Sequence, residues 1–98
     1  MTARVTPQVA AEVMQRDGGC VAVLLGAADD CRDKWGTAVR SDAKAALTLD
    51  HVRDQPMMGK SAPSDARHLV TLCWGHHLHG WATSHRPEIR EYLERVNG

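Results

Sequence analysis

The last third of the chain contains a short apolar run that leads directly into a cysteine and a pair of histidines: His68-Leu69-Val70-Thr71-Leu72-Cys73-Trp74-Gly75-His76-His77. Residues 68–72 predict a short buried strand, because brief apolar runs with β-branched residues are typical of one. The spacing Cys73-x2-His76 lets two side chains bind one tetrahedral ion. The stretch therefore predicts a strand followed, over residues 75–81, by a helix or a tight metal-binding turn.

A second strand is predicted upstream at residues 47–52, Leu-Thr-Leu-Asp-His-Val. Residues 54–65 contain two prolines, a glycine and two serines, and they predict the loop between the two strands. Adjacent residues on a regular strand point to opposite faces. Asp50 and His51 can therefore share one site only if the strand ends, bulges or twists there, which the following loop allows.

A helix is predicted at each end of the chain. The first covers Val5–Arg16, with Thr6 as the N-cap and Pro7 at the first helical position. The second begins at Ser84 or His85 and carries an apolar stripe at helical spacing, formed by Ile89, Tyr92, Leu93 and Val96.

The segment between the first helix and the strand at 47–52 is less regular. Residues 20–25 predict a short buried strand, and residues 26–30 predict a turn that ends at Cys31. Residues 36–46 fit either one helical turn capped by Ser41 or a loop.

Composition limits the class of protein. The chain has 98 residues, no Phe, and 12 basic against 12 acidic side chains, so its formal charge is zero. A single small domain with so few aromatic residues is expected to need a metal or disulfides for stability. Zero net charge argues against binding to nucleic acid by bulk electrostatics alone, but it leaves local contacts open.

The sequence also predicts a cytoplasmic protein with no membrane partner. The longest run of apolar residues and glycine, Val21–Ala28, is too short to span a bilayer, and the start lacks the pattern of a secretory signal. Three cysteines cannot form a closed set of disulfides, so they are available as thiols or metal ligands.

The first candidate site is a soft-ligand cluster. Cys20, Cys31, Cys73 and His76 together would form a Cys3His zinc site. The gap of ten residues between Cys20 and Cys31 is longer than the usual two to four, and the turn at 26–30 would have to bring them together. The alternative is that the cysteines only fill the core.

The second candidate site uses harder ligands. All six histidines lie between His51 and His85, and Asp50, His51, His68, His77 and His79 form its candidate members. A carboxylate beside imidazoles can hold a divalent ion while a neutral imidazole takes a proton near pH 7. His85 is expected to cap a helix or face solvent.

These residues resemble a known family. Leu49-Asp50-His51-Val52 followed by residues 68–77 is similar to the HNH endonucleases of the ββα-metal fold, and residues 16–20 resemble the lead-in to their zinc knuckle. The short length and the Met58-Gly59-Lys60 loop look most like the small HNH proteins of actinobacterial phages. The resemblance covers about residues 16–82 and implies an α+β single domain over residues 1–98, with an N-terminal helix (1–19), a zinc-bound core (20–82) and a C-terminal helix (83–98).

The resemblance also implies roles by position. Asp50 and His77 would be ligands of a catalytic ion, Mg²⁺ or a substitute such as Mn²⁺ or Ni²⁺, and His51 would be the general base. His68 stands where the family has its central Asn, so it either braces His51 or binds metal. Cys73 and His76 match structural zinc positions, with His76 in place of a Cys. His79 lies three residues after His76 and could replace either neighbour.

The activity implied is metal-assisted hydrolysis of DNA phosphodiester bonds, leaving 5′-phosphate and 3′-hydroxyl ends. Arg53, Lys60 and Arg67 would contact phosphates, or else they belong to a solvated loop. The resemblance to phage proteins implies that the protein acts in the cytoplasm of a bacterial host. It also implies phage packaging proteins as partners. The alternative function is a catalytically inactive, zinc-stabilised nucleic-acid-binding or accessory module.

The three tryptophans are assigned separately. Trp74 and Trp81 bracket the histidine cluster, and we expect them to pack around the metal sites rather than stack on bases. Trp35 is expected in the core.

Overall fold

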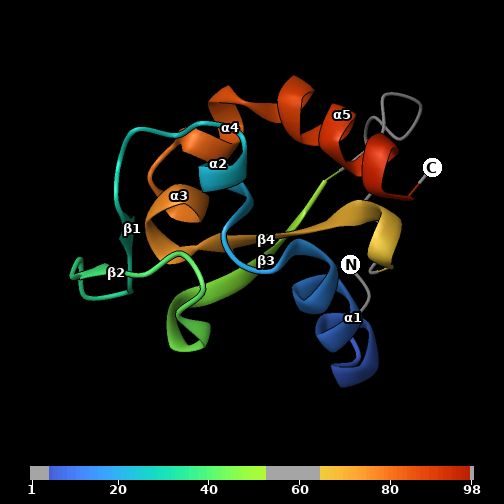
Figure 1. Ribbon diagram of the computed structural model, residues 1–98, viewed down its shortest axis with the longest axis horizontal. Coiled ribbons are helices and arrows are strands. Elements are labelled where there is room, and N and C mark those ends of the chain that lie inside the picture. Colours follow the sequence, from blue (N-terminus) through green and yellow to red (C-terminus); the bar gives the residue numbers. More distant parts are fainter. Residues whose placement is uncertain (1–4, 53–64, 98) are drawn as a thin grey trace.

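The computed structural model describes residues 5–52 and 65–97, and its architecture is α+β (Figure 1). The predicted loop at 54–65 lies outside the described residues, apart from Asp65. In the described ranges, no helix has the length and apolar character needed to cross a membrane. The elements in chain order are α1 (Pro7–Asp17), α2 (Val21–Leu24), β1 (Cys31–Arg32), β2 (Ala38–Val39), η1 (Lys44–Ala46), β3 (Leu47–His51), η3 (Ala66–His68), β4 (Leu69–Cys73), α3 (Trp74–Leu78), α4 (Trp81–Ser84) and α5 (Arg86–Asn97).

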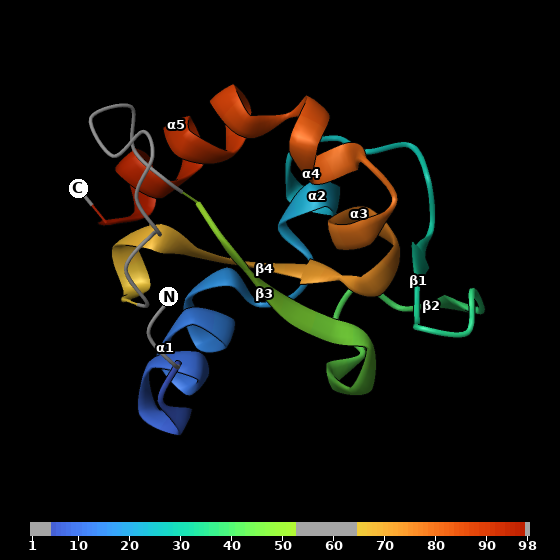
Figure 2. The ribbon, with the colours of Figure 1, turned by 180° about the vertical axis from the view of Figure 1, so that it is seen from behind.

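The centre of the molecule is the antiparallel pair β3–β4, which confirms the two predicted strands. Its register places Asp50 opposite Val70 and His51 opposite Leu69. Every residue of β4 is buried, as expected of a short apolar strand covered on both faces. Figures 1 and 2 show α1 and α5 on opposite sides of this pair, with α2, α3 and α4 grouped towards one end.

The two terminal helices are also confirmed. The hydroxyl of Thr6 accepts a hydrogen bond from the backbone N–H of Val9, and Pro7 is the first helical residue of α1. Gly18 ends the helix in the left-handed conformation, at φ 72°. Helix α5 buries Ile89, Tyr92 and Leu93 of the predicted stripe, whereas Val96, near its end, is exposed.

Two predictions in the first half of the chain are wrong. Residues 20–25 do not form a strand, because Val21–Leu24 make one helical turn, α2. A short apolar run does not distinguish a strand from a buried helical turn by periodicity alone. Trp35 is not in the core: it lies in the turn of the β1–β2 hairpin with 79% of its surface exposed.

The segment at 36–46 contains both regular and irregular structure. Ala38–Val39 form β2, which pairs with β1, and Lys44–Ala46 form the 3₁₀ turn η1. The residue before this turn is Ala43, which provides no side-chain cap, so the turn forms without the Ser41 cap that was one of the two alternatives for this segment.

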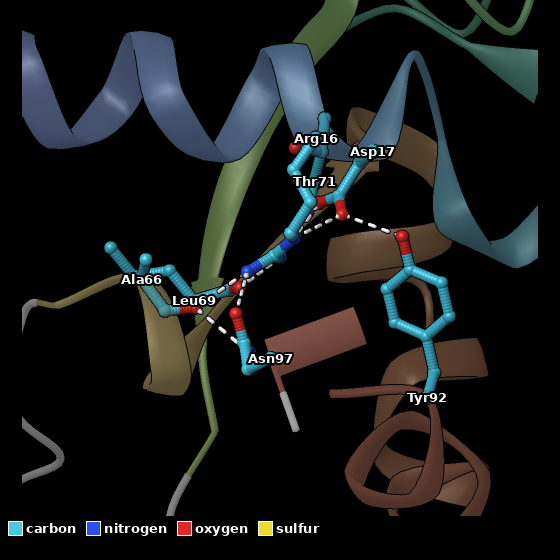
Figure 3. Close-up of polar contacts among 7 residues, drawn as sticks. All are labelled: Arg16, Asp17, Ala66, Leu69, Thr71, Tyr92 and Asn97. Atoms are coloured by element: carbon cyan, nitrogen blue, oxygen red, sulfur yellow. Dashed lines mark hydrogen bonds and ion pairs between the residues drawn. The ribbon is translucent and has the colours of Figure 1, made fainter. Parts of the chain in front are cut away.

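A buried carboxylate joins α1, β4 and α5 (Figure 3). Asp17 accepts two hydrogen bonds from Arg16, one from the backbone N–H of Thr71 and one from the hydroxyl of Tyr92. The guanidinium of Arg16 also donates to backbone carbonyls in η3 and at the start of β4. This network fixes α5 and β4 relative to each other, and both elements contribute to the sites described next.

Candidate metal centre and neighbouring acidic site

The structure brings the four predicted soft ligands together. Cys20 precedes α2, Cys31 begins β1, Cys73 ends β4, and His76 lies in α3. All four are buried, and their ligand atoms lie within 4.8 Å of one another. The His76 Nδ1 atom is 3.2 Å from Cys73 Sγ, 3.5 Å from Cys20 Sγ and 3.9 Å from Cys31 Sγ.

These separations fit a tetrahedral zinc ion. Zn–S bonds of about 2.3 Å and a Zn–N bond of about 2.05 Å at the tetrahedral angle place sulfur and nitrogen about 3.6 Å apart. The donor set, three thiols and one imidazole, is one that zinc prefers. The cluster can therefore hold a metal such as zinc.

Without a bound cation, the thiols of the cluster keep their protons and the imidazole is neutral. Burial raises the pKa of the Cys20 and Cys31 thiols, and the neighbouring thiols add to the effect at Cys31. Burial lowers the pKa of His76, which keeps its imidazole neutral and able to coordinate. A bound divalent ion would replace the thiol protons and neutralise the buried thiolates.

Local structure explains how distant residues meet here. The Cys73 sulfur accepts a hydrogen bond from the backbone N–H of His76 and so caps α3, which places the two ligands one helical turn apart. The Cys20 sulfur accepts from the backbone N–H of Cys73. The long gap from Cys20 to Cys31 is taken up by α2 and by a turn at Gly26, whose φ is +90°.

One atom of this cluster lacks a partner among the described residues. The Nε2 atom of His76 is buried without a hydrogen bond. His76 and Asp29 both line a cavity of about 570 Å³, and the charge of Asp29 acts on the imidazole by raising its pKa against the larger effect of burial. A carboxylate commonly orients a metal-binding histidine by accepting a hydrogen bond from its free ring nitrogen. Asp29 is exposed and makes no such bond in this structure, but it lines the same cavity and is the candidate for that role.

A second group lies at the other face of α3. The His77 Nε2 atom is 3.3 Å from Asp50 Oδ1, and Arg86 donates to Asp50 Oδ2 at 2.6 Å. The Thr48 hydroxyl donates to the backbone carbonyl of Leu72 and lies 2.6 Å from His77 Nδ1.

Both ring nitrogens of His77 have a neighbour on β3. Nδ1 lies 2.6 Å from the Thr48 hydroxyl, and Nε2 lies 3.3 Å from Asp50 Oδ1. An ionised carboxylate can only accept, so the Nε2–H group is the donor in the contact with Asp50. The imidazole is therefore oriented from both sides.

Asp50 is charged in this setting. It is only 5% exposed, and burial alone would raise its pKa, but hydrogen bonds from His77 and Arg86 together lower it. The Asp50 carboxylate and the His77 imidazole are thus directly adjacent, with Oδ1 3.3 Å from Nε2.

The other two predicted active-site histidines lie at the ends of β3 and η3. His51 is half-buried and is the last residue of β3; Asp50 and His51 both pair with β4 in the regular register, so the strand does not end or bulge between them. His68 is buried, with Nδ1 2.6 Å from Asp65 Oδ1. Its backbone carbonyl accepts from Val52, the residue after His51.

The remaining candidates are dispersed. His79 is exposed and follows α3, so His76, and not His79, lies with the three cysteines. Arg67 is exposed in η3, whereas Arg53 and Lys60 lie outside the described residues. Trp81 packs edge-on against His76, in agreement with the expected packing role, and it stacks on His85.

Sequence reasoning missed two residues of the acidic site. Thr48 lies two positions before Asp50 on β3, so strand alternation could have placed the two side chains on one face. Arg86 is 36 positions from Asp50 and begins α5, and no local pattern signals that contact.

Comparisons with protein-family models, with curated proteins and with solved structures find no match to this chain.

Proposed function

We propose that this protein is a metal-dependent DNA endonuclease of the HNH type, with one structural zinc and a separate catalytic ion. The observation that carries the proposal is the approach of Asp50 and His77, which come from the first strand and from the helix of the unit formed by β3, β4 and α3. A purely structural zinc site does not need this second pair.

The zinc-binding cluster supports the proposal by fixing α3. Cys73 and His76 belong to the same turn that presents His77 on the neighbouring face of the helix. A zinc ion on the first two residues would hold the third in place towards Asp50. The two sites are therefore mechanically coupled but chemically distinct.

The proposed reaction is hydrolysis of a phosphodiester bond. Asp50 and His77 would hold a divalent ion such as Mg²⁺, which stabilises negative charge on phosphoryl oxygens. His51, at the end of β3, would take the proton from the attacking water. Arg86 keeps Asp50 ionised, and Thr48 fixes the imidazole of His77 with Nε2 turned towards Asp50. His68 would brace the backbone next to His51 through Val52.

A second candidate function is a zinc-stabilised nucleic-acid-binding module without catalysis. The observation that favours it is the short ion pair from Arg86 to Asp50, which already balances the charge of the carboxylate. The link to phage DNA packaging rests on the resemblance of the sequence alone.

A plasmid-nicking assay with Mg²⁺ or Mn²⁺ separates the two functions. Wild-type protein is expected to nick supercoiled DNA, and His51→Ala is expected to lower the rate about 10²–10⁴-fold, as removal of a general base does. His85→Ala is the matched control, because His85 contacts Trp81 and not the acidic site. If wild type and His51→Ala are equally inert while both are folded and hold zinc, the nuclease proposal fails.

A further inference from the structure

The turn of the β1–β2 hairpin presents a tryptophan to solvent. Trp35 is 79% exposed, the largest fraction among the exposed large apolar side chains of the described residues. Tryptophan is usually mostly buried, because its ring carries a large apolar surface. An indole held in water is therefore a candidate contact surface.

Hydrogen bonds fix the backbone of the turn that carries this indole. The backbone N–H of Gly36 donates to the carbonyl of Asp33, and the N–H of Asp33 donates to the carbonyl of Thr37. The Asp33 side chain accepts from the N–H groups of Trp35 and Thr37. Gly36 has φ +82°, which completes a three-residue hairpin loop with a left-handed glycine. The base of the hairpin begins at Cys31, so a bound ion would anchor it as well.

Two cationic side chains lie at this turn, one of them over the exposed ring. The Lys34 ammonium lies 5.0 Å from the centre of the Trp35 ring. The Arg32 guanidinium donates to the Gly36 carbonyl and so stays beside the turn. The carboxylate of Asp33 is directed inward to the backbone of the turn. The tip thus combines one flat aromatic surface with two positive side chains.

This combination matches a nucleic-acid strand better than other partners. Bases stack on an exposed aromatic ring, and nearby lysine and arginine neutralise the phosphates. Insertion into a lipid surface would need more apolar residues around the tryptophan, but its neighbours in the turn are Asp33, Lys34, Gly36 and Thr37. A protein-docking patch would likewise need a contiguous apolar area.

The hairpin also lies next to the helix of the acidic site. A Cβ atom placed on Gly75 in α3 would be 3.2 Å from the Cβ of Arg32, so β1 and α3 pack closely. Figures 1 and 2 show the β1–β2 hairpin projecting beyond α3, at the end of the molecule far from the C-terminus. A strand bound at the tip would thus lie beside the helix that carries His77.

We propose that Trp35 is a stacking contact for an unpaired nucleotide base, with Lys34 and Arg32 on the adjoining phosphates. The inference rests on the proposed function for its nucleic-acid ligand, but it does not require catalysis.

The test is the binding of a fluorescent oligodeoxythymidine of about 16 nucleotides to zinc-loaded protein without Mg²⁺, measured by anisotropy. Trp35→Ala is expected to weaken binding about 5–150-fold, the equivalent of about 1–3 kcal/mol for one stacked base. Trp35→Phe is expected to retain part of the affinity. Leu24→Ala is the matched control, because it truncates another exposed apolar side chain, 61% exposed in α2, and should leave affinity unchanged.

Zinc content and circular dichroism must be the same in all variants. The inference is then overturned if Trp35→Ala binds the oligonucleotide as tightly as Leu24→Ala does, or if wild type does not bind it. It is also overturned if Trp35 instead mediates binding to lipid vesicles or to a second copy of the chain. The inference and the proposed function can fail separately. If the protein nicks DNA but its binding does not depend on Trp35, only the stacking site is refuted. If binding depends on Trp35 but no nicking occurs, only the nuclease function is refuted.

Discussion

Replacement of Tyr92 by phenylalanine tests the buried network that holds α5, and with it Arg86, against the rest of the molecule. The Tyr92 hydroxyl donates to Asp17 Oδ1 at 2.6 Å, and Tyr92 is 5% exposed. Phenylalanine keeps the packed ring and removes only this hydrogen bond. The change therefore isolates one contact without opening a large cavity.

The magnitude follows from the partners that remain. A hydrogen bond to a charged group contributes about 1.5–3 kcal/mol. Asp17 keeps its bonds from Arg16 and from the Thr71 N–H, so it is not left unsatisfied, and the lower part of that range applies. We expect a loss of about 1.5–2 kcal/mol in the free energy of unfolding, or about 6–16 °C in Tm for a chain of this size.

The pH dependence of the stability difference between the two proteins is a second, independent test of this hydrogen bond. Burial, and then the hydrogen bond to Asp17 and its charge, raise the pKa of Tyr92 from 10.0 to about 12. The protonated hydroxyl is the form that donates, so its contribution to stability is complete below pH 10 and is lost as pH rises towards 12. The stability difference between wild type and Tyr92→Phe should therefore shrink across this window.

The assay is thermal unfolding of both zinc-loaded proteins by circular dichroism, at neutral pH and at several values between pH 9 and the alkaline limit of folding. Other groups that titrate there are shared by the two proteins, so their effects cancel in the difference. A difference below about 0.5 kcal/mol at neutral pH, the size of an ordinary surface substitution, would refute the reasoning. So would a difference that grows with pH.

Three further predictions concern the metal centre and its scaffold. Chelation of zinc should abolish cooperative thermal unfolding, because structural zinc contributes about 10–16 kcal/mol, as much as the whole stability of a typical domain; an unchanged Tm would contradict this. Asp29→Asn should weaken zinc binding about 10–100-fold in competition with a chelator, with Asp30→Asn as the unaffected control; equal affinities would exclude Asp29 as the group that orients His76. Gly19→Ala should lower the free energy of unfolding by about 1–3 kcal/mol, since its Cβ would lie 2.8 Å from the Ser41 carbonyl oxygen; an unchanged urea midpoint would show that the backbone adapts.

Local patterns in the sequence were sufficient for the parts of the fold that local physics determines. The N-cap at Thr6 and the short runs that form β3 and β4 depend on neighbouring residues, and both terminal helices and both central strands can be predicted from them. The membership of the soft cluster could also be predicted, because few side chains bind zinc and the Cys73-x2-His76 spacing is diagnostic.

The wrong or missing predictions concern features that depend on residues far apart in the sequence. Within residues 20–25, Val21–Leu24 form a helical turn, although the apolar run itself fits either a strand or a helix. Trp35 was assigned to the core on residue type, but the turn set by Asp33 and Gly36 directs it to solvent. Arg86 reaches Asp50 only because α5 folds back over the strand pair. The spacing of residues along the sequence does not indicate such a contact.

We propose that α3 serves two metal sites: His76 belongs to the buried zinc cluster, and His77 would bind the second ion together with Asp50. The most direct measurement is the number of Mn²⁺ ions that zinc-loaded protein binds, followed by electron paramagnetic resonance with zinc content determined in parallel. We predict a single Mn²⁺ per wild-type chain, loss of that ion in His77→Ala, and retained zinc in both. Absence of Mn²⁺ binding by folded, zinc-loaded wild type, or equal binding by His77→Ala, would contradict the account.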